Sequence, residues 1–102
     1  MIKIMNLRVQ RPRRDHEVRV DRTSILGNPY NVNKDMPRDK SCDQYELWFE
    51  NQMQHSGAFN AALEELVDIY EEHGRLNLYC WCAPLRCHAE TIKHWLERRL
   101  GL

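Results

Sequence analysis

The stretch RLNLYCWCAPLRCH, residues 75–88, carries the strongest structural signal in the chain. Apolar side chains fill both faces of a strand predicted over residues 75–82, and strands of this kind lie at the centre of parallel sheets. Pro84 ends the strand, and apolar residues at helical spacing predict a helix from about His88 to Leu100. The step between them is the kind of place where open α/β sheets bind ligands.

Periodic apolar residues predict four further elements on the amino-terminal side of this stretch. They are strands over residues 2–9 and 17–22, and helices over residues 37–54 and 58–72. The two strands could form a hairpin with an arginine-rich loop at its tip. Residues 23–36 form an irregular loop that is longer than most connections. The sequence therefore predicts an α/β fold, a small Rossmann-like layered domain whose short sheet is covered by about three helices.

The composition indicates one globular domain, residues 1–102. Basic and acidic residues balance at fifteen each, which argues against a dedicated non-specific DNA-binding protein. A domain of this size must build its core from most of its large apolar residues. We therefore expect Trp48, Trp81 and Trp95 to anchor the core.

The sequence also bears on compartment. No stretch reaches the roughly 18 apolar residues of a membrane span, and the first residues lack the apolar region of a signal peptide. We therefore expect a cytoplasmic protein that makes no membrane contact. In a reducing cytoplasm, cysteines are more often thiols, metal ligands or redox groups than disulfides. Three of the four cysteines fall within residues 80–87, which makes this cluster the main candidate site.

Cys87 and His88 stand where the predicted strand loop enters the last helix. Unpaired N–H groups at a helix start stabilise a thiolate or a bound anion. Cys87 could therefore be a thiolate at neutral pH, with His88 as a base, and we name both as catalytic candidates. The structural alternative is that Cys80 and Cys82 are buried core residues, while Cys87 and His88 cap the helix.

A metal site is a second interpretation of the same turn. Cys80, Cys82, Cys87 and His88 could supply a Cys₃His zinc set, although the C-x-C-x4-C-H spacing lacks paired C-x2-C knuckles. The chain would then be a zinc-stabilised interaction module that binds a host protein or nucleic acid.

Two further chemistries involve anions. Cys80 and Arg86 match the C-x5-R spacing of cysteine phosphatase and rhodanese-like loops, but the glycines of the phosphatase loop are missing. Alternatively, the helix start could hold the phosphate of a nucleotide whose base stacks on Tyr30 or Trp81.

Three segments in the same order resemble a known family. They are RTSILGNPY at residues 22–30, Arg38-Asp39 followed by YELWF at residues 45–49, and LYCWCAPLRCH at residues 78–88. They are similar to the motifs of the domain of unknown function 4326 family. The resemblance implies a small α/β domain in a bacterial or phage-infected cytoplasm, and it brings no established activity. It marks these positions: Arg22, Asn28, Pro29, Arg38, Cys80, Cys82, Cys87 and His88.

The marked positions suggest a pocket at one edge of the sheet. Arg22, Asn28, Arg38 and Cys82 would bind the ligand beside Cys87 and His88. The leading prediction is a site for a nucleotide-like or phosphorylated small ligand, with turnover left open. The structural alternative is that Asn28 belongs to a rigid turn and that both arginines pair with acids.

The arginine-rich loop has its own two interpretations. Arg8, Arg11, Arg13 and Arg14 could contact the phosphates of nucleic acid. A short basic run in a loop is more often a solvated tip, and the sequence favours that interpretation.

Overall fold

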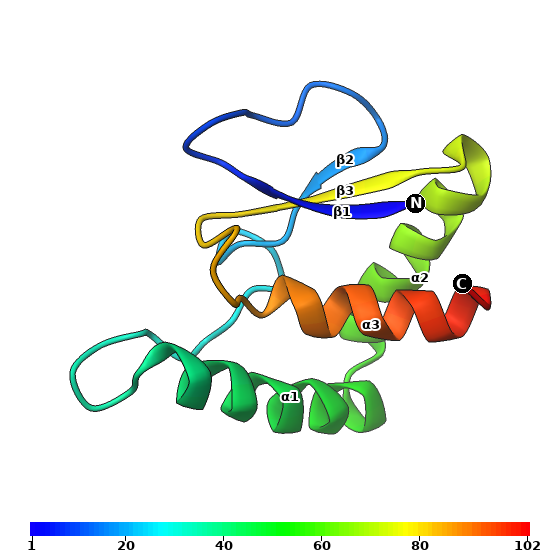
Figure 1. The fold of residues 1–102 in the computed structure, drawn as a ribbon. Helices are drawn as coiled ribbons and strands as arrows, with labels where there is room; N and C mark the ends of the chain where they lie inside the picture. Colours follow the sequence, from blue (N-terminus) through cyan, green and yellow to red (C-terminus); the bar gives the residue numbers. More distant parts are fainter.

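Six elements make up the structure, a computed structural model that describes residues 1–102. They are β1 (Ile2–Asn6), β2 (Glu17–Arg19), α1 (Arg38–His55), α2 (Gly57–His73), β3 (Leu76–Cys80) and α3 (Ala89–Leu100). The sheet has the order β1-β3-β2, and both outer strands run parallel to β3 (Figure 1). The α/β class and the central position of β3 are therefore confirmed.

The expected hairpin of the first two strands is wrong. β3 lies between β1 and β2 and pairs with both in parallel. Because β3 is apolar on both faces, it takes the centre of the sheet and leaves the edges to the two short strands. The loop over residues 7–16 therefore crosses over the sheet to join its two edges, and it does not turn back as a hairpin tip (Figure 1).

All three carboxyl ends of the strands meet at one edge of the sheet. Asn6 lies opposite Cys80, and Arg19 lies opposite Tyr79. β3 ends two residues earlier than the sequence predicts. The Asn6 side chain donates a hydrogen bond to the Ala83 carbonyl at 2.6 Å, which helps hold the segment after Cys80 in a turn.

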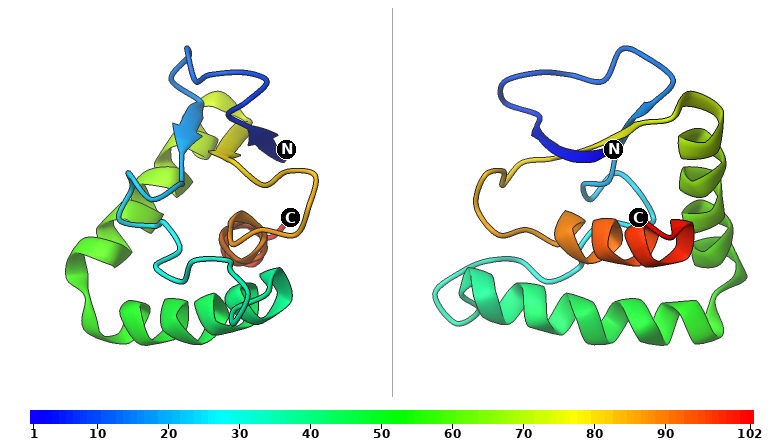
Figure 2. Two further views of the ribbon diagram at one scale, coloured as in Figure 1. Left: turned by 90° about the vertical axis from the view of Figure 1, so that its left-hand side faces the viewer. Right: turned by 45° about the vertical axis from the view of Figure 1, so that its right-hand side comes forward.

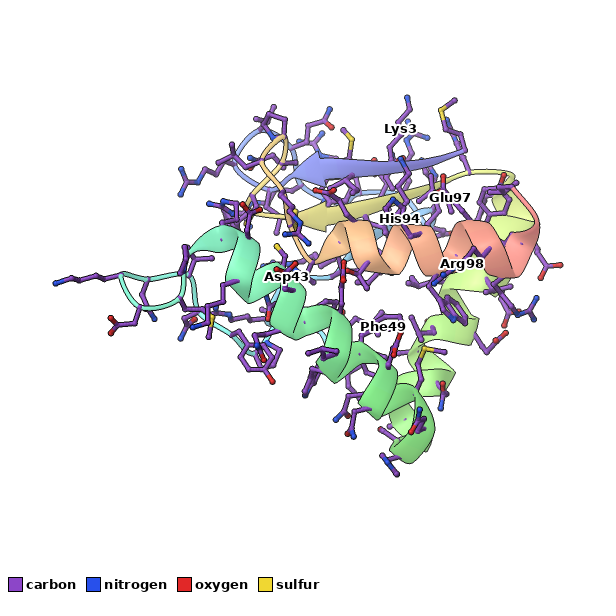
Figure 3. All side chains as sticks on the ribbon, turned by 60° about the horizontal axis from the view of Figure 1, so that its bottom comes forward. Lys3, Asp43, Phe49, His94, Glu97 and Arg98 are labelled. Atoms are coloured by element: carbon purple, nitrogen blue, oxygen red, sulfur yellow. The ribbon has the colours of Figure 1, made fainter.

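The three helices lie on one side of the sheet (Figures 1 and 2). α3 contacts β1 and β3, and α2 contacts β3. α1 forms a further layer on the far side of α3 from the sheet (Figure 3). None of the helices combines the length and apolar character needed to span a membrane.

Local signals explain where the helices end. Ser56 alone separates α1 from α2, and its hydroxyl accepts a hydrogen bond from the Phe59 N–H at 3.1 Å. Gly74 ends α2 with φ of 71°, a left-handed conformation that suits glycine, and its N–H donates to the Tyr70 carbonyl at 2.7 Å.

The core fills the space between β3 and the helices. β3 contributes Leu76, Leu78 and Cys80, and the helices contribute residues such as Phe59 and Ile92. Aromatic rings join α1 to α2, and the Phe49 and Phe59 ring centroids are 5.3 Å apart. Trp48 and Trp95 are partly buried and pack against this core as expected.

Trp81 corrects the expectation that all three tryptophans lie in the core. Its side chain follows the end of β3 and remains 42% exposed. Tyr79, the preceding residue on the strand, is fully buried beneath the loop over residues 7–16, and its hydroxyl donates to Glu17 Oε2 at 2.8 Å. This loop covers the sheet face opposite the helices (Figure 2).

Candidate functional site

A cavity of about 430 Å³ lies at the carboxyl ends of β2 and β3, and we call it the strand-end cavity. Its size falls in the range typical of small-molecule sites, about 300–1,000 Å³. The lining includes all four predicted ligand residues together with Cys80 and His88. These six residues are Arg22, Asn28, Arg38, Cys80, Cys82 and His88. Cys87 does not line the cavity, because its side chain is buried behind Cys80.

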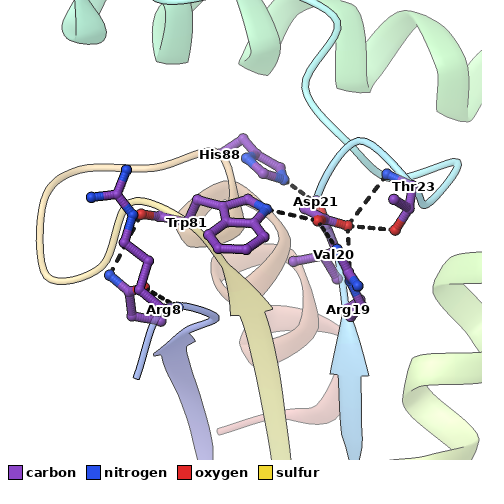
Figure 4. Close-up of polar contacts among 8 residues, drawn as sticks. Arg8, Arg19, Val20, Asp21, Thr23, Trp81 and His88 are labelled. Carbon is purple, nitrogen blue, oxygen red and sulfur yellow. Dashed lines mark hydrogen bonds and ion pairs between the residues drawn. The ribbon is translucent and has the colours of Figure 1, made fainter. Parts of the chain in front are cut away.

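Asp21 organises one wall of this cavity (Figure 4). Its carboxylate accepts hydrogen bonds from the Arg19 guanidinium at 2.5 Å, the Thr23 hydroxyl at 2.6 Å and the Trp81 indole N–H at 2.9 Å. Burial acts to raise the pKa of Asp21, but these hydrogen bonds hold it well below its usual range. Asp21 therefore connects the end of β2 to the turn after β3, and Arg19 balances the negative charge of its carboxylate.

The two cavity arginines have no acidic partner. Arg22 Nε donates to the Asn28 carbonyl at 3.2 Å, and Arg38 Nη1 donates to the Arg86 carbonyl at 3.4 Å. Neither forms an ion pair with a carboxylate. The structure therefore does not support the alternative in which both arginines pair with acids.

Asn28 lines the cavity, and its side-chain hydrogen bonds agree with the alternative in which it belongs to a rigid turn. Its Oδ1 accepts the Tyr30 N–H at 2.9 Å, and its Nδ2 donates to the Ser41 hydroxyl at 3.0 Å. The Ser41 hydroxyl in turn donates to the Tyr30 carbonyl at 2.8 Å. Asn28 thus fastens the loop before α1 to that helix, and it shapes the cavity wall through the loop.

Cys80 and Cys87 form a close pair of thiols. The Cys87 S–H donates to Cys80 Sγ, with 2.9 Å between the two sulfurs. This hydrogen bond lowers the pKa of Cys80 to about 6 against the effect of burial, with help from the N–H groups of Cys82 and Ala83. The same bond and burial raise the pKa of Cys87. The structure therefore differs from the expectation of a Cys87 thiolate, and Cys80 is the thiol that favours the charged form.

His88 is buried and held in one orientation. Its Nε2 lies 2.5 Å from the Val20 carbonyl, which can only accept, so Nε2 carries the proton. Burial lowers the pKa of His88 and favours the neutral ring. Its Nδ1 is then an acceptor 3.7 Å from Cys87 Sγ. His88 can thus exchange a proton with the thiol pair only through Cys87.

Arg86 does not play the part that the C-x5-R spacing would give it. Its guanidinium points to α1, where it pairs with Asp39 at 3.2 Å, Asp43 at 2.9 Å and Glu46 at 3.6 Å. It is absent from the lining of the strand-end cavity. Arg86 fastens the turn after β3 to the first helix and offers nothing to an anion beside Cys80.

The residues predicted as zinc ligands are not arranged around a common metal position. No group of three or more histidine, cysteine, aspartate or glutamate side chains is arranged to hold a metal ion. His88 Nε2 is engaged with the Val20 carbonyl and is not free to bind a metal. The zinc site stays a prediction that a metal measurement tests.

Asp21 is the site residue that the sequence analysis missed. It lies two residues after the end of β2, at the edge where parallel strands end, whereas the sequence places it inside the strand predicted over residues 17–22. Because the strand predicted from apolar alternation extends to residue 22, the sequence gives no signal that Asp21 and Arg22 lie beyond the strand end.

Comparisons with known proteins give one result. A family model described as "Domain of unknown function (DUF4326)" matches residues 5–98, nearly the whole chain. No curated protein and no solved structure matches the chain.

Proposed function

The chain belongs to the DUF4326 family, a domain of unknown function, and on the geometry of the strand-end cavity we propose that it binds a nucleotide-like or other phosphorylated small molecule. One observation carries the proposal. Two arginines without acidic partners, Arg22 and Arg38, line the same cavity at the carboxyl edge of a parallel sheet. Guanidinium groups form bidentate, charge-assisted hydrogen bonds with phosphate oxygens.

The other walls suit a base or a sugar. Tyr30 and Trp81 also line the cavity, and aromatic side chains stack on nucleobases. The only carboxylate in the lining, Asp21, is already neutralised by Arg19, so the cavity keeps a positive balance. A phosphorylated ring compound therefore fits the cavity better than a neutral or cationic ligand.

Cys80 is the proposed reactive group of this site. It lines the cavity, and the hydrogen bond from the Cys87 S–H lowers its pKa, which favours the thiolate. Cys87 is a proton donor to Cys80, and His88 is a proton acceptor behind Cys87. This arrangement reassigns the thiolate role that the sequence analysis gave to Cys87.

The binding proposal is tested by thermal shift and calorimetry with nucleoside monophosphates, sugar phosphates, inorganic phosphate and unphosphorylated nucleosides. Phosphorylated compounds should raise the melting temperature, because a ligand that binds only the folded state stabilises it. Arg22→Ala or Arg38→Ala should each weaken binding about 10- to 100-fold, as for the loss of a charged hydrogen bond of about 1.5–3 kcal/mol.

Arg75→Ala is the matched control. Arg75 is exposed, forms no ion pair and lies at the opposite end of β3. It should bind like the unchanged protein. If no phosphorylated compound binds, or if Arg75→Ala weakens binding as much as Arg22→Ala, the proposal is wrong.

Metal content of the purified protein separates this proposal from the zinc-stabilised module. Stoichiometric zinc, with loss of the fold in chelator, would contradict the free Cys80 thiolate and favour the module. Metal-free protein that binds phosphorylated ligands would favour the strand-end cavity.

A further inference from the structure

The loop over residues 7–16 has no part in the strand-end cavity, yet it holds the densest group of positive charges in the chain. Arg8, Arg11, Arg13 and Arg14 are all exposed. None of their guanidinium groups forms an ion pair with a carboxylate. Four free cations within seven residues repel one another, so their grouping calls for an anionic partner.

These arginines border a second cavity of about 560 Å³, which we call the arginine cavity. Its other side is formed by Tyr79 and Trp81. Glu17 is the only carboxylate in its lining. Its oxygens already accept hydrogen bonds from the backbone N–H groups of Arg13 and Arg14 and from the Tyr79 hydroxyl. The guanidinium groups thus remain available to a ligand.

Trp81 joins the two cavities, because it lines both of them. Arg11 lies over its ring, with Cζ 5.9 Å from the ring centroid, and its indole N–H is fixed by Asp21. Figure 4 shows Trp81 between Arg8 on one side and Asp21 on the other. A partly exposed aromatic ring beside a basic groove is the combination with which proteins bind single-stranded nucleic acid, since bases stack on the ring and phosphates follow the cations.

We propose that the ligand is a single strand of nucleic acid. One nucleotide occupies the strand-end cavity, a neighbouring base stacks on Trp81, and the adjoining phosphates lie against the arginine cavity. The proposal rests on the function proposed for the strand-end cavity and extends it by the shared tryptophan. It also revises the view of the arginine-rich loop as a solvated tip, because the loop packs over Tyr79 and walls a cavity.

The test compares a fluorescein-labelled oligothymidylate of about eight nucleotides, within the usual site sizes, with thymidine monophosphate as competitor. The oligonucleotide should bind at least about 10-fold tighter than the monophosphate, because it reaches both cavities. The double variant Arg11→Gln/Arg13→Gln should remove most of this gain and leave monophosphate binding unchanged. It should also reduce the slope of log K against log salt by about 1.4, the value for two lost single-strand phosphate contacts.

The matched control is Arg75→Gln/Arg98→Gln, which makes the same change in net charge. Both residues are exposed and outside the two cavities, so neither binding should change. If the oligonucleotide binds no tighter than a monophosphate that still binds, the strand proposal is overturned and the function of the strand-end cavity stands. If neither binds, both proposals fall. Equal affinity for duplex DNA or for polyglutamate overturns the strand proposal in favour of a general polyanion surface.

Discussion

At the scale of single residues, the chemistry of the site depends on which of two adjacent thiols carries the negative charge. The sulfurs of Cys80 and Cys87 are 2.9 Å apart, too close for both to ionise. Cys80 Sγ also accepts hydrogen bonds from the N–H groups of Cys82 and Ala83. By contrast, Cys87 Sγ accepts one, from the Ala89 N–H at 3.4 Å, and lies beside His88. These contacts favour the negative charge on Cys80, which lines the cavity.

A titration of thiolate absorbance near 240 nm tests this assignment. One thiolate should form with a midpoint well below that of an ordinary cysteine. Cys80→Ser should abolish this transition, and Cys87→Ala should move it to higher pH because the S–H donor is lost. Cys42→Ser is the control, since burial raises the pKa of Cys42 and it should not contribute in this range. Absence of any thiolate below pH 8 would refute the assignment.

The same shift has a consequence for stability. The pKa of Cys80 is lower in the folded state, at about 6, than the reference value of 9.0 for an unfolded thiol. A lowered folded-state pKa gives stability that is complete above the unfolded pKa and is lost as the pH falls through the folded one. The free energy of unfolding should therefore fall as the pH is lowered from about 9 to about 6, and Cys80→Ser should flatten this dependence.

At the scale of elements, the turn from Asp21 to Asn28 leaves no room for a side chain at Gly27. A Cβ atom on Gly27 would lie 2.4 Å from the Asp21 carbonyl oxygen and 2.7 Å from the Arg22 Cα. Both contacts are with backbone, so only an opening of the turn could relieve them. The close approach explains why a glycine stands here, and it links the backbone of Gly27 to the position of Arg22.

Gly27→Ala should accordingly destabilise the protein and weaken the binding of phosphorylated ligands. Overpacking of this kind costs about 1–3 kcal/mol, which urea denaturation measures. Gly57→Ala is the control at the start of α2, where an added Cβ meets no atom within 4 Å. It should be neutral or stabilise the helix by up to about 1 kcal/mol. If the two substitutions change the free energy of unfolding equally, the close contact at Gly27 does not destabilise the substituted protein.

At the scale of the whole molecule, the sequence predicts where helices and strands lie along the chain better than it predicts which strands pair in the sheet. β3 and the helices follow from apolar periodicity, which is a local property. The pairing of β1 and of β2 with β3 is not a local property. Alternating apolar residues indicate that a segment is a strand, but they do not indicate which strand it pairs with. The exposure of Trp81 also depends on where β3 ends, and the ionisation of Cys80 depends on a distance between side chains.

The layered arrangement further predicts an order of opening. β3 lies between two strands and under the helices, with Leu76 and Leu78 fully buried. α1 lies a layer away from the sheet, and all its buried residues fall within residues 41–49. Amide hydrogen exchange should therefore be slowest in β3 and fastest, among helical residues, over 50–55 of α1, because local opening costs least where little surface is buried.

Two substitutions in α1 test whether this order reflects packing. Phe49 is buried against Phe59, whereas Leu47 is 66% exposed. Phe49→Ala should destabilise the whole protein by about 3–5 kcal/mol and speed exchange in β3 as well as in α1. Leu47→Ala should change stability by no more than about 0.5 kcal/mol and leave β3 as it was. If Phe49→Ala speeds exchange in α1 alone, α1 opens independently of the sheet. The site residue Arg38, at the start of α1, would then move with this helix and not with the sheet edge where the strands end.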